Sequence, residues 1–282
     1  MFLDRKVQLK KPTEIALMRK AGLVVADTLA MLRDAVAPGV TTGELDRLAE
    51  ELIRSRGAVP SFMGYLGYPA SICTSVNDEV VHGIPGERVL RDGDLVSIDC
   101  GAIVEGWHGD AAITVGVGEI SAELQELARV CEDALWRGLA AMRVGGRLGD
   151  VSAAVEAGVR SAGAAYGIVE DYVGHGIGTQ MHQPPNVPNV GKPGKGLRLQ
   201  PGWAIAVEPM ITLGSLETDV LDDDWTVVTV DGSYAAHVEH TVALTERGPW
   251  VLTAHDGGAA RLAALGVQVG APPAGGPPAG GK

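Results

Sequence analysis

The chain has 282 residues, of which 46% are hydrophobic, enough to bury the core of one large domain or two small ones. Lys and Arg number 23 and Asp and Glu 35, and the resulting net charge of −12 argues against a nucleic-acid or anionic-membrane surface. The three cysteines form no CxxC pair, which favours a reducing compartment and excludes a disulfide scaffold or a thiolate zinc site; they are Cys73, Cys100 and Cys131.

The N-terminal stretch has no apolar run that could serve as a secretory signal, and no apolar stretch is long enough to span a bilayer. We therefore expect a cytoplasmic protein without membrane contact. Residues 1–12 are predicted to be an extended, basic N-terminal extension. Its charge fits either a solvated face or a transient contact with ribosomal RNA; the basic residues are Arg5, Lys6, Lys10, Lys11, Arg19 and Lys20.

Two helices are predicted next, from apolar residues at helical spacing and from start and stop signals. The first begins at Thr13 and ends near Pro38. The second has Thr42 as its N-cap and runs to about Arg56, where a glycine follows. A loop rich in Tyr, Gly and Pro leads to short strands at 70–75 and 80–85.

Residues 95–115 are predicted to form a hairpin of two apolar strands joined by the two-residue loop Glu105-Gly106. One acid lies inside each strand, Asp99 in the first and Asp110 in the second. With this loop Asp99 opposes Ala112, and the two acids become diagonal neighbours on one face, with Cβ atoms roughly 7 Å apart. They are either ordinary acids on a solvated face or carboxylates that share cations.

The pattern then begins again, with a helix from Ser121 to about Met142. Residues 38–58 align with 144–164 at an offset of 106, with seven identities in 21 positions. We interpret this similarity as an internal duplication, with halves at about 13–117 and 118–250. Later landmarks repeat as well: HGI at 82–84 matches 175–177, and the two acids of the hairpin match Glu208 and Glu239.

The duplication makes a solvated-face explanation improbable, because it would have to apply to four acids in apolar strands. A pseudo-twofold axis between the halves would bring Asp99, Asp110, Glu208 and Glu239 together near the axis. Four buried negative charges cannot coexist without cations. Two divalent ions would neutralise them, so we predict a dinuclear metal site.

The histidine in the second HGI motif, His175, is the best candidate for a further ligand, because its neighbouring glycines allow close backbone approach. Its repeat partner His82 and the nearby His182 are weaker candidates, and His240 should point away from Glu239. Four carboxylates and one imidazole suit Mn, Fe(II), Co or Zn. Two such ions can hold a bridging water or hydroxide and polarise a carbonyl, which is hydrolytic chemistry.

The C-terminal stretch 256–282 is rich in Pro, Gly and Ala and is predicted to be a disordered tail. The expected domain organisation is therefore an N-terminal extension at 1–12, a single domain at 13–255, and this tail.

The ordered set of motifs closely resembles type I methionine aminopeptidases over residues 11–250. The motifs are VHGIP (81–85), SIDCG (97–101), HGD (108–110), GHGIG (174–178), EPM (208–210) and VEHT (238–241). The resemblance implies the pita-bread fold, an α/β (α+β) domain of two pseudo-symmetric halves with a curved antiparallel sheet flanked by helices. It also implies five metal ligands, Asp99, Asp110, His175, Glu208 and Glu239.

The same resemblance implies roles around the metals. Glu208 would move a proton between the attacking water and the leaving amine, His182 would hold the scissile carbonyl, and His82 would contact the substrate backbone and assist proton transfer. The pocket for the initiator methionine would consist of Phe62, Tyr65, Tyr68, Cys73, His82, Met181, His182 and Trp225. Phe62 and Met181 depart from the residue types common in the family, which leaves the pocket shape open; ordinary core packing is the rival explanation for Phe62 and Cys73.

The resemblance implies a cytoplasmic, monomeric metallo-exopeptidase that removes initiator methionine from nascent chains whose second residue is small. The attack would come from a water or hydroxide that bridges two divalent ions (Co, Mn, Fe or Zn). Partners would be nascent N-termini and, transiently, the ribosome. The alternatives are a proline-directed aminopeptidase or prolidase on the same fold, and a non-catalytic pita-bread binding protein.

Overall fold

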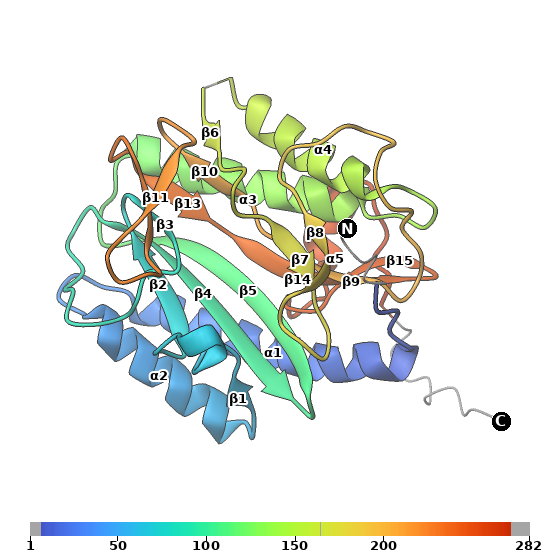
Figure 1. Cartoon of the computed structure of the whole chain (residues 1–282), viewed down its shortest axis with the longest axis horizontal. Helices are drawn as coiled ribbons and strands as arrows, with labels where there is room; N and C mark the ends of the chain where they lie inside the picture. The colour runs from blue at the N-terminus through green and yellow to red at the C-terminus, as the bar shows by residue number, and fades with distance from the viewer. Residues whose placement is uncertain (1–6, 164, 272–282) are drawn as a thin grey trace.

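The computed structural model describes residues 7–163 and 165–271 (Figure 1). In this part of the chain a nine-stranded antiparallel sheet carries the fold, in the order β1-β4-β5-β14-β9-β7-β8, with β2 paired to β4 and β15 to β14. The strands are β1 (Val59–Pro60), β2 (Ile72–Val76), β4 (Leu95–Val104), β5 (Trp107–Gly116), β7 (Gly174–Gly176), β8 (Gln183–Val187), β9 (Ala204–Val207), β14 (Glu239–Thr245) and β15 (Gly248–Val251).

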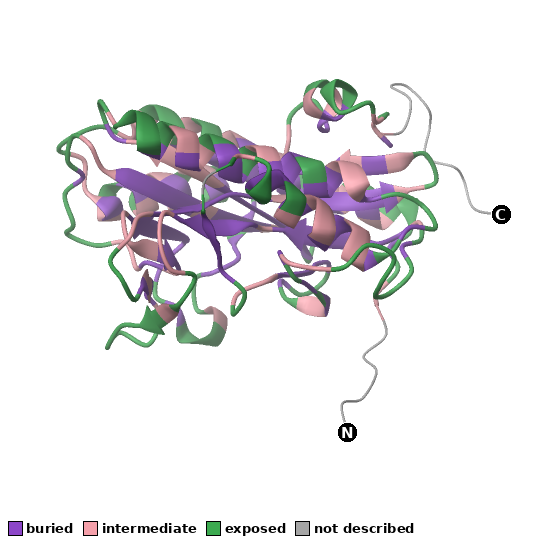
Figure 2. Cartoon of the chain, turned by 90° about the horizontal axis from the view of Figure 1, so that it is seen from above, coloured by how far each residue is buried: buried purple, intermediate pink, exposed green. Residues whose placement is uncertain are grey.

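Four helices cover one face of the sheet, while loops cover the other (Figure 2). They are α1 (Pro12–Ala35), α2 (Thr42–Ser55), α3 (Ala122–Ala141) and α4 (Leu148–Arg160). Two starts differ from the prediction by one residue. The first helix begins at Pro12, a residue that suits the first helical turn because its missing N–H is not needed there. The second is capped by Thr41 rather than Thr42, because Thr41 Oγ1 accepts the Glu44 N–H while the Glu44 carboxylate accepts the Thr41 N–H.

The predicted duplication is visible in matched backbone hydrogen bonds. Gly43 N–H donates to Gly86 O in the first half, and Gly149 N–H donates to Lys195 O in the second. The same match holds for Gly93 with Val117 and for Gly202 with Leu244. In each half the second helix is tied in the same way to a later loop, and the turn before the next central strand is tied to the end of its partner strand, so the two halves repeat one structural unit.

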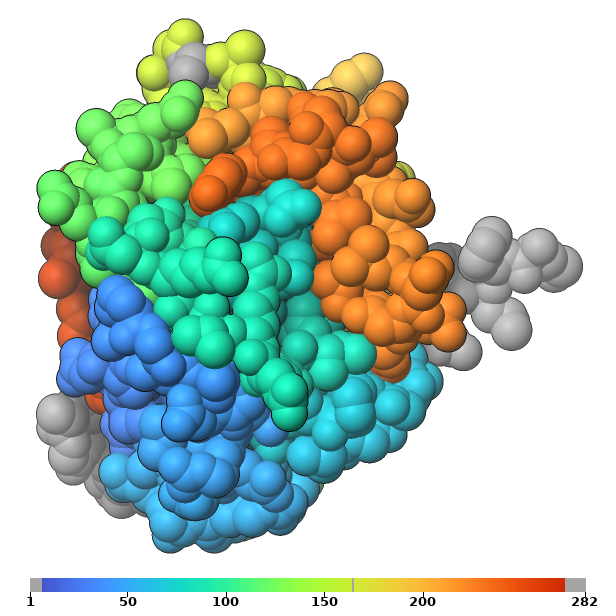
Figure 3. Space-filling model, turned by 90° about the vertical axis from the view of Figure 1, so that its left-hand side faces the viewer, coloured from blue at the N-terminus to red at the C-terminus, as the bar shows by residue number. Residues whose placement is uncertain are grey.

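The halves differ in what joins their two central strands. The β4–β5 hairpin closes through Glu105-Gly106 as predicted. Between β9 and β14 the chain instead forms an insertion, residues 208–238, whose strands pair in two three-stranded sheets. The insertion (orange) lies against the N-terminal half (teal) in Figure 3, where β12 pairs with β3. The strands concerned are β3 (Glu79–Val81), β6 (Gly167–Ile168), β10 (Met210–Thr212), β11 (Thr218–Val220), β12 (Val227–Thr229) and β13 (Ala235–His237).

The prediction of a disordered tail from residue 256 is wrong for the part that the structure describes. Helix α5 (Ala259–Ala264) follows β15, and Leu262 on it is completely buried in the larger hydrophobic cluster. Asp256 accepts the N–H groups of Gly258 and Ala260 and so anchors the start of this helix. Residues 272–282, the rest of the predicted tail, lie outside the described residues.

The hydrophobic core lies between the helices and the sheet, as the purple band in Figure 2 shows. Two large clusters of buried residues form it, one against α3 and α4 and one against α1 and α2, so each half contributes its own packed layer. Within the described ranges, no helix combines the length and the apolar composition that a membrane crossing requires.

Candidate metal centre and substrate pocket

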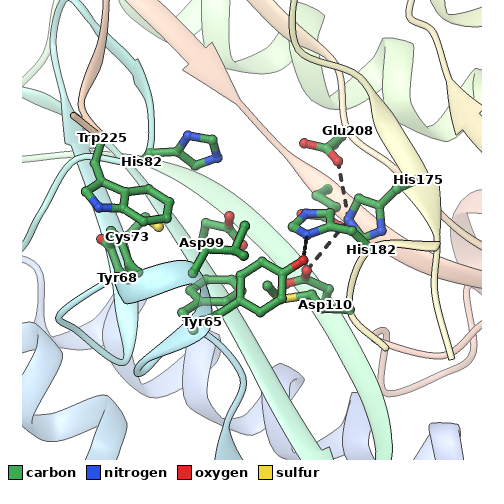
Figure 4. Close-up of a pocket in the computed structure, with 14 residues that line it drawn as sticks. Tyr65, Tyr68, Cys73, His82, Asp99, Asp110, His175, His182, Glu208 and Trp225 are labelled. Carbon is green, nitrogen blue, oxygen red and sulfur yellow. Dashed lines mark hydrogen bonds and ion pairs between the residues drawn. The ribbon is translucent and has the colours of Figure 1, made fainter. Parts of the chain in front are cut away.

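The four predicted acids line one cavity at the centre of the sheet (Figure 4). The register of the hairpin is as predicted, with Asp99 opposite Ala112 on β4 and β5. On its other side Ala112 opposes Glu239, the first residue of β14, while Glu208 directly follows β9. Because side chains alternate along a strand, this register turns acids from both halves to the same face.

His175 enters the cavity from β7, a strand with glycine on either side of it. A Cβ on Gly174 would collide with Ala206 O, and one on Gly176 would collide with Pro184 O, so glycines are required for this close approach. The Nδ1–H of His175 donates to the carbonyl oxygen of Gly176 at 3.0 Å. The unprotonated Nε2 therefore faces the acids, 3.6 Å from Glu208 Oε1 and 3.9 Å from Asp110 Oδ2.

The electrostatics of the cluster require a cation. Burial raises the pKa of Asp99 to about 7 and that of Glu208 to about 8. It also raises the pKa values of Asp110 and Glu239, and the neighbouring carboxylates raise these two further. Among the described residues, the ion-pair partners of these carboxylates are histidines alone. One oxygen each of Asp99, Asp110 and Glu239 is buried and has no hydrogen-bond partner in the part of the chain that the structure describes. A hard divalent ion would fit this cluster, because its ligand atoms are mostly carboxylate oxygens.

The ligand atoms fall into two groups that meet at Glu239. One group is Asp110, His175 and Glu239, and the other is Glu208, His237 and Glu239; within each, the ligand atoms lie within 4.8 Å of one another. His237 was missed as a site residue. Its buried Nε2 has no hydrogen-bond partner within residues 7–163 and 165–271 and lies 3.5 Å from Glu208 Oε2. A signal was available, because His237 lies two residues before Glu239 and so shares its face.

All predicted pocket residues line the same cavity, which has a volume of about 190 Å³. Its apolar wall is a cluster in which Tyr68 meets Phe62 edge-on at 6.4 Å and Trp225 at 5.0 Å between ring centres. Leu66, which sequence reasoning missed, also lines it from the turn η1 (Tyr65–Gly67), where it adopts a left-handed backbone with φ of 51°.

Two further histidines stand at the edge of the cavity. His182 Nδ1 lies 2.9 Å from the hydroxyl of Tyr65, and its ring contacts that of His175 at 4.3 Å (Figure 4). His82 meets the ring of Trp225 edge-on at 6.1 Å. Burial lowers the pKa of His82 to about 4 and also lowers that of His182, so both rings are neutral at pH 7.

A second, smaller cavity of about 110 Å³ adjoins the first. Asp99, His82, His182 and Glu208 line both cavities, so the two meet at the acids. The walls that belong to the smaller cavity alone are Val81, Tyr172, Val173, Met210 and His237.

Comparison with known proteins places this arrangement in a family. Residues 16–246 match the family profile described as metallopeptidase family M24. The chain is 52% identical over 246 residues to a protein named methionine aminopeptidase from Clostridium acetobutylicum, covering 87% of this chain and 98% of that protein. It is 55% identical over 254 residues to methionine aminopeptidase 1 of Mycobacterium tuberculosis, covering 88% and 96%.

Solved structures agree with the family match. A crystal structure of methionine aminopeptidase from Thermotoga maritima superposes with a TM-score of 0.86 at 43% identity, covering 88% of this chain and 99% of that one. The prolidase from Pyrococcus furiosus shares the fold alone, with a TM-score of 0.70 at 21% identity, and this chain covers 65% of it. The predicted pita-bread architecture, two α/β halves around a curved antiparallel sheet, is confirmed.

Proposed function

The chain belongs to metallopeptidase family M24, and from this premise we propose how its central cavity performs the reaction of the family members it resembles. The protein is a hydrolase, an aminopeptidase that removes the initiator methionine, and its cofactors are divalent metal ions. The observation that carries the assignment to this cavity is that buried acids, three of which have an oxygen without a hydrogen-bond partner among the described residues, adjoin an apolar, aromatic-lined pocket.

We propose that the residues holding two divalent ions are Asp99, Asp110, His175, Glu208 and Glu239. Support comes from the two ligand groups that share Glu239, which include every proposed ligand except Asp99, and from the raised pKa values of the four acids, which four positive charges would relieve. Asp99 is proposed from its raised pKa and its place on the wall of the same cavity. When bound, such ions lower the pKa of a water molecule and polarise the substrate carbonyl.

Glu208 is the residue proposed to move the proton. Burial disfavours the charge of Glu208 and raises its pKa to about 8, which supports a carboxyl that accepts a proton readily. His175 and His237 lie at either side of its carboxylate, at 3.6 and 3.5 Å. A carboxylate held in this way can take a proton from the attacking water and return it to the leaving amine.

His182 is proposed to bind the scissile carbonyl. If the hydroxyl of Tyr65 donates to Nδ1, at 2.9 Å, the ring proton lies on Nε2 and can be donated to an oxygen that gains negative charge in the transition state. His82 lines both cavities and contacts Trp225, a position from which it can reach the substrate backbone between the two cavities. It is proposed to assist proton transfer there.

The larger cavity is proposed to take the methionine side chain. The thioether sulfur of methionine makes favourable contacts with aromatic rings. The cavity wall provides such rings from Phe62, Tyr65, Tyr68 and Trp225, together with the side chain of Met181. The smaller cavity, of about 110 Å³, is proposed to face the second residue. Its size supports the expected restriction to small second residues.

The rival assignments are weaker. Prolidases share the fold at identities of 20 to 24%, and this chain spans about two thirds of their length. A non-catalytic binding protein would be marked by lost ligands, whereas all five proposed ligands face the cavity here. A cytoplasmic location is also proposed, supported by three buried free cysteines. Transient ribosome contact and a monomeric state remain predictions.

The test uses metal-stripped protein and two peptides, Met-Ala-Ser and Lys-Pro-Ala, each incubated with and without added Mn or Co. Mass spectrometry should show loss of a single methionine, only from the first peptide and only with metal. Cleavage of the second peptide would move the assignment to the proline-directed enzymes. Cleavage of neither, in folded protein that binds metal, would favour the binding-protein alternative.

A further inference from the structure

A cavity of about 470 Å³ lies between α1 and the face of the sheet opposite the candidate metal centre. It is lined by α1, by Ile113 of β5, by His240 of β14 and by the loop at 253–256. His240 follows Glu239 in β14, and because neighbours in a strand point to opposite faces, it faces away from the acids, as predicted. The described function makes no use of this cavity.

The hydrogen bonds around His240 indicate which of its ring nitrogens carries the proton. The hydroxyl oxygen of Thr253 accepts the N–H of Thr241 at 3.1 Å and lies 2.8 Å from His240 Nδ1. Among the described residues, Nδ1 is the one acceptor within reach of the Thr253 hydroxyl proton. Nδ1 therefore accepts, and the ring carries its proton on Nε2, which has no partner in the described part of the chain. The result is a donor on the cavity wall.

Around the cavity, one cation and one acid have no ion-pair partner among the described residues. The carboxylate of Asp256 accepts two N–H groups at the start of α5, and Asp27 pairs with His255 at 2.9 Å. Arg33 and Asp34, neighbours in the last turn of α1, form no ion pair within residues 7–163 and 165–271, and both line the cavity.

The rest of the wall is apolar and small. Ala26 and Leu29 are buried, while Ala30 and Ile113 present further hydrocarbon to the cavity. The guanidinium of Arg33 and the imidazole N–H of His240 lie beside this apolar wall. Together they are complementary to a small molecule that has a carboxylate and a short apolar chain.

We propose that this cavity binds a small apolar carboxylic acid, with its carboxylate on Arg33 and His240 Nε2–H and its hydrocarbon on Ala26, Leu29, Ala30 and Ile113. Two sources share this chemistry, a short fatty acid and a free apolar amino acid. They differ in the α-ammonium group, which Asp34 is placed to bind. The matched probes are therefore 4-methylpentanoate and L-leucine, which differ by that group alone.

The experiment follows the His240 imidazole nitrogen signals by NMR in full-length, zinc-loaded protein during titration with each probe. At least one probe should shift the Nε2 signal saturably. Arg33→Gln should weaken this binding about tenfold or more, the cost of one charged hydrogen bond. Ala30→Phe, which fills the cavity, should abolish it. Arg47→Gln, on the surface of α2, is the matched control and should bind as wild type.

The comparison of probes identifies the source. Tighter binding of leucine, lost in Asp34→Asn, points to an amino acid, and tighter binding of 4-methylpentanoate points to a fatty acid. Absence of a saturable shift with either probe overturns the proposal. So does a shift of equal affinity in Arg33→Gln and Ala30→Phe, because the probe would then bind elsewhere. Circular dichroism of each variant separates loss of binding from loss of fold.

Discussion

The two halves of the molecule present their acids in matched pairs, although their strands are joined in different ways. Asp110 and Glu239 are fully buried, at 3% and 2% exposure, while Asp99 and Glu208 are both only partly buried. Each half thus contributes one deep and one more accessible carboxylate. The pseudo-symmetric strands explain this match, since corresponding positions face the same cavity.

The differences between the halves lie where the chain departs from the repeat. The first half joins its strands by two residues, and no ion pair is formed by Asp99 among the described residues. The second half inserts residues 208–238, and this insertion brings Trp225 to the larger cavity and His237 to the smaller one. In the proposed mechanism the repeated strand positions supply the four acidic metal ligands, Glu208 among them, and the insertion supplies Trp225 as one wall of the substrate pocket.

The largest expected effect tests the special role of the second half. Glu208→Gln keeps the shape of the side chain but removes its capacity to carry a proton, so turnover of Met-Ala-Ser should fall by about 10²–10⁴-fold. In metal-free protein at pH 7 the thermal unfolding midpoint should change little, because burial raises the pKa of Glu208 to about 8 and the carboxyl is already mostly neutral. Glu217→Gln, an exposed acid of the same insertion, is the control. A Glu208→Gln enzyme with a rate near wild type would remove the shuttle role.

The symmetry of the ligand frame predicts equal effects in the two halves. Asp110→Asn and Glu239→Gln each remove one negative charge from the deep pair, and both should weaken metal binding by about 10- to 100-fold. Calorimetric titration of metal-stripped protein with Mn measures this loss, with the exposed Glu51→Gln as control. A large effect in one variant and none in the other would break the proposed equivalence of the halves.

The pocket wall should depend on the insertion. Trp225→Ala removes a ring that contacts Tyr68 and His82, and it should raise KM for Met-Ala-Ser about tenfold while changing kcat less. Val220→Ala, exposed on β11 of the same insertion, is the matched control. If kcat fell instead with KM unchanged, Trp225 would act on the chemical step and not on binding of the methionine side chain.

Sequence reasoning predicted the frame well, because strands with period-2 patterning and a two-residue loop admit one register. That register placed Asp99 opposite Ala112, and the duplication then located Glu208 and Glu239. Both steps use local rules and a comparison of the chain with itself. These two steps were enough to predict that the four acids lie in one site, without knowledge of the remaining fold.

The missed features depend on contacts between distant segments. The N–H of His237 is accepted by Ser97 and Thr114 of the other half at 3.1 Å each. Its spacing from Glu239 indicated the face on which it lies, but not this contact, which fixes its position. Helix α5 was missed because its Gly- and Ala-rich sequence resembles a disordered tail. Its order rests on burial of Leu262 among residues far away in the chain.

The smallest expected effect concerns the segment that links the halves. Lys10 belongs to the N-terminal extension, yet its N–H donates to Gly202 O in the second half at 2.7 Å, and the residue is 4% exposed. Burial lowers the pKa of its amine to about 8. Below pH 8 the folded state therefore carries a desolvated charge, and between pH 8 and about 10.4 the unfolded state binds more protons, so stability rises with pH.

Lys10→Met removes this charge and keeps most of the volume. At pH 7 it should raise the free energy of unfolding by about 2 kcal/mol, and the gain should shrink towards zero by about pH 10, where the unfolded amine also loses its proton. Urea unfolding at both pH values measures the difference. Lys20→Met, at an exposed ion pair with Glu105, should show no such pH dependence. A gain of equal size at both pH values would mean that packing, and not desolvation of the amine, sets the stability of this link.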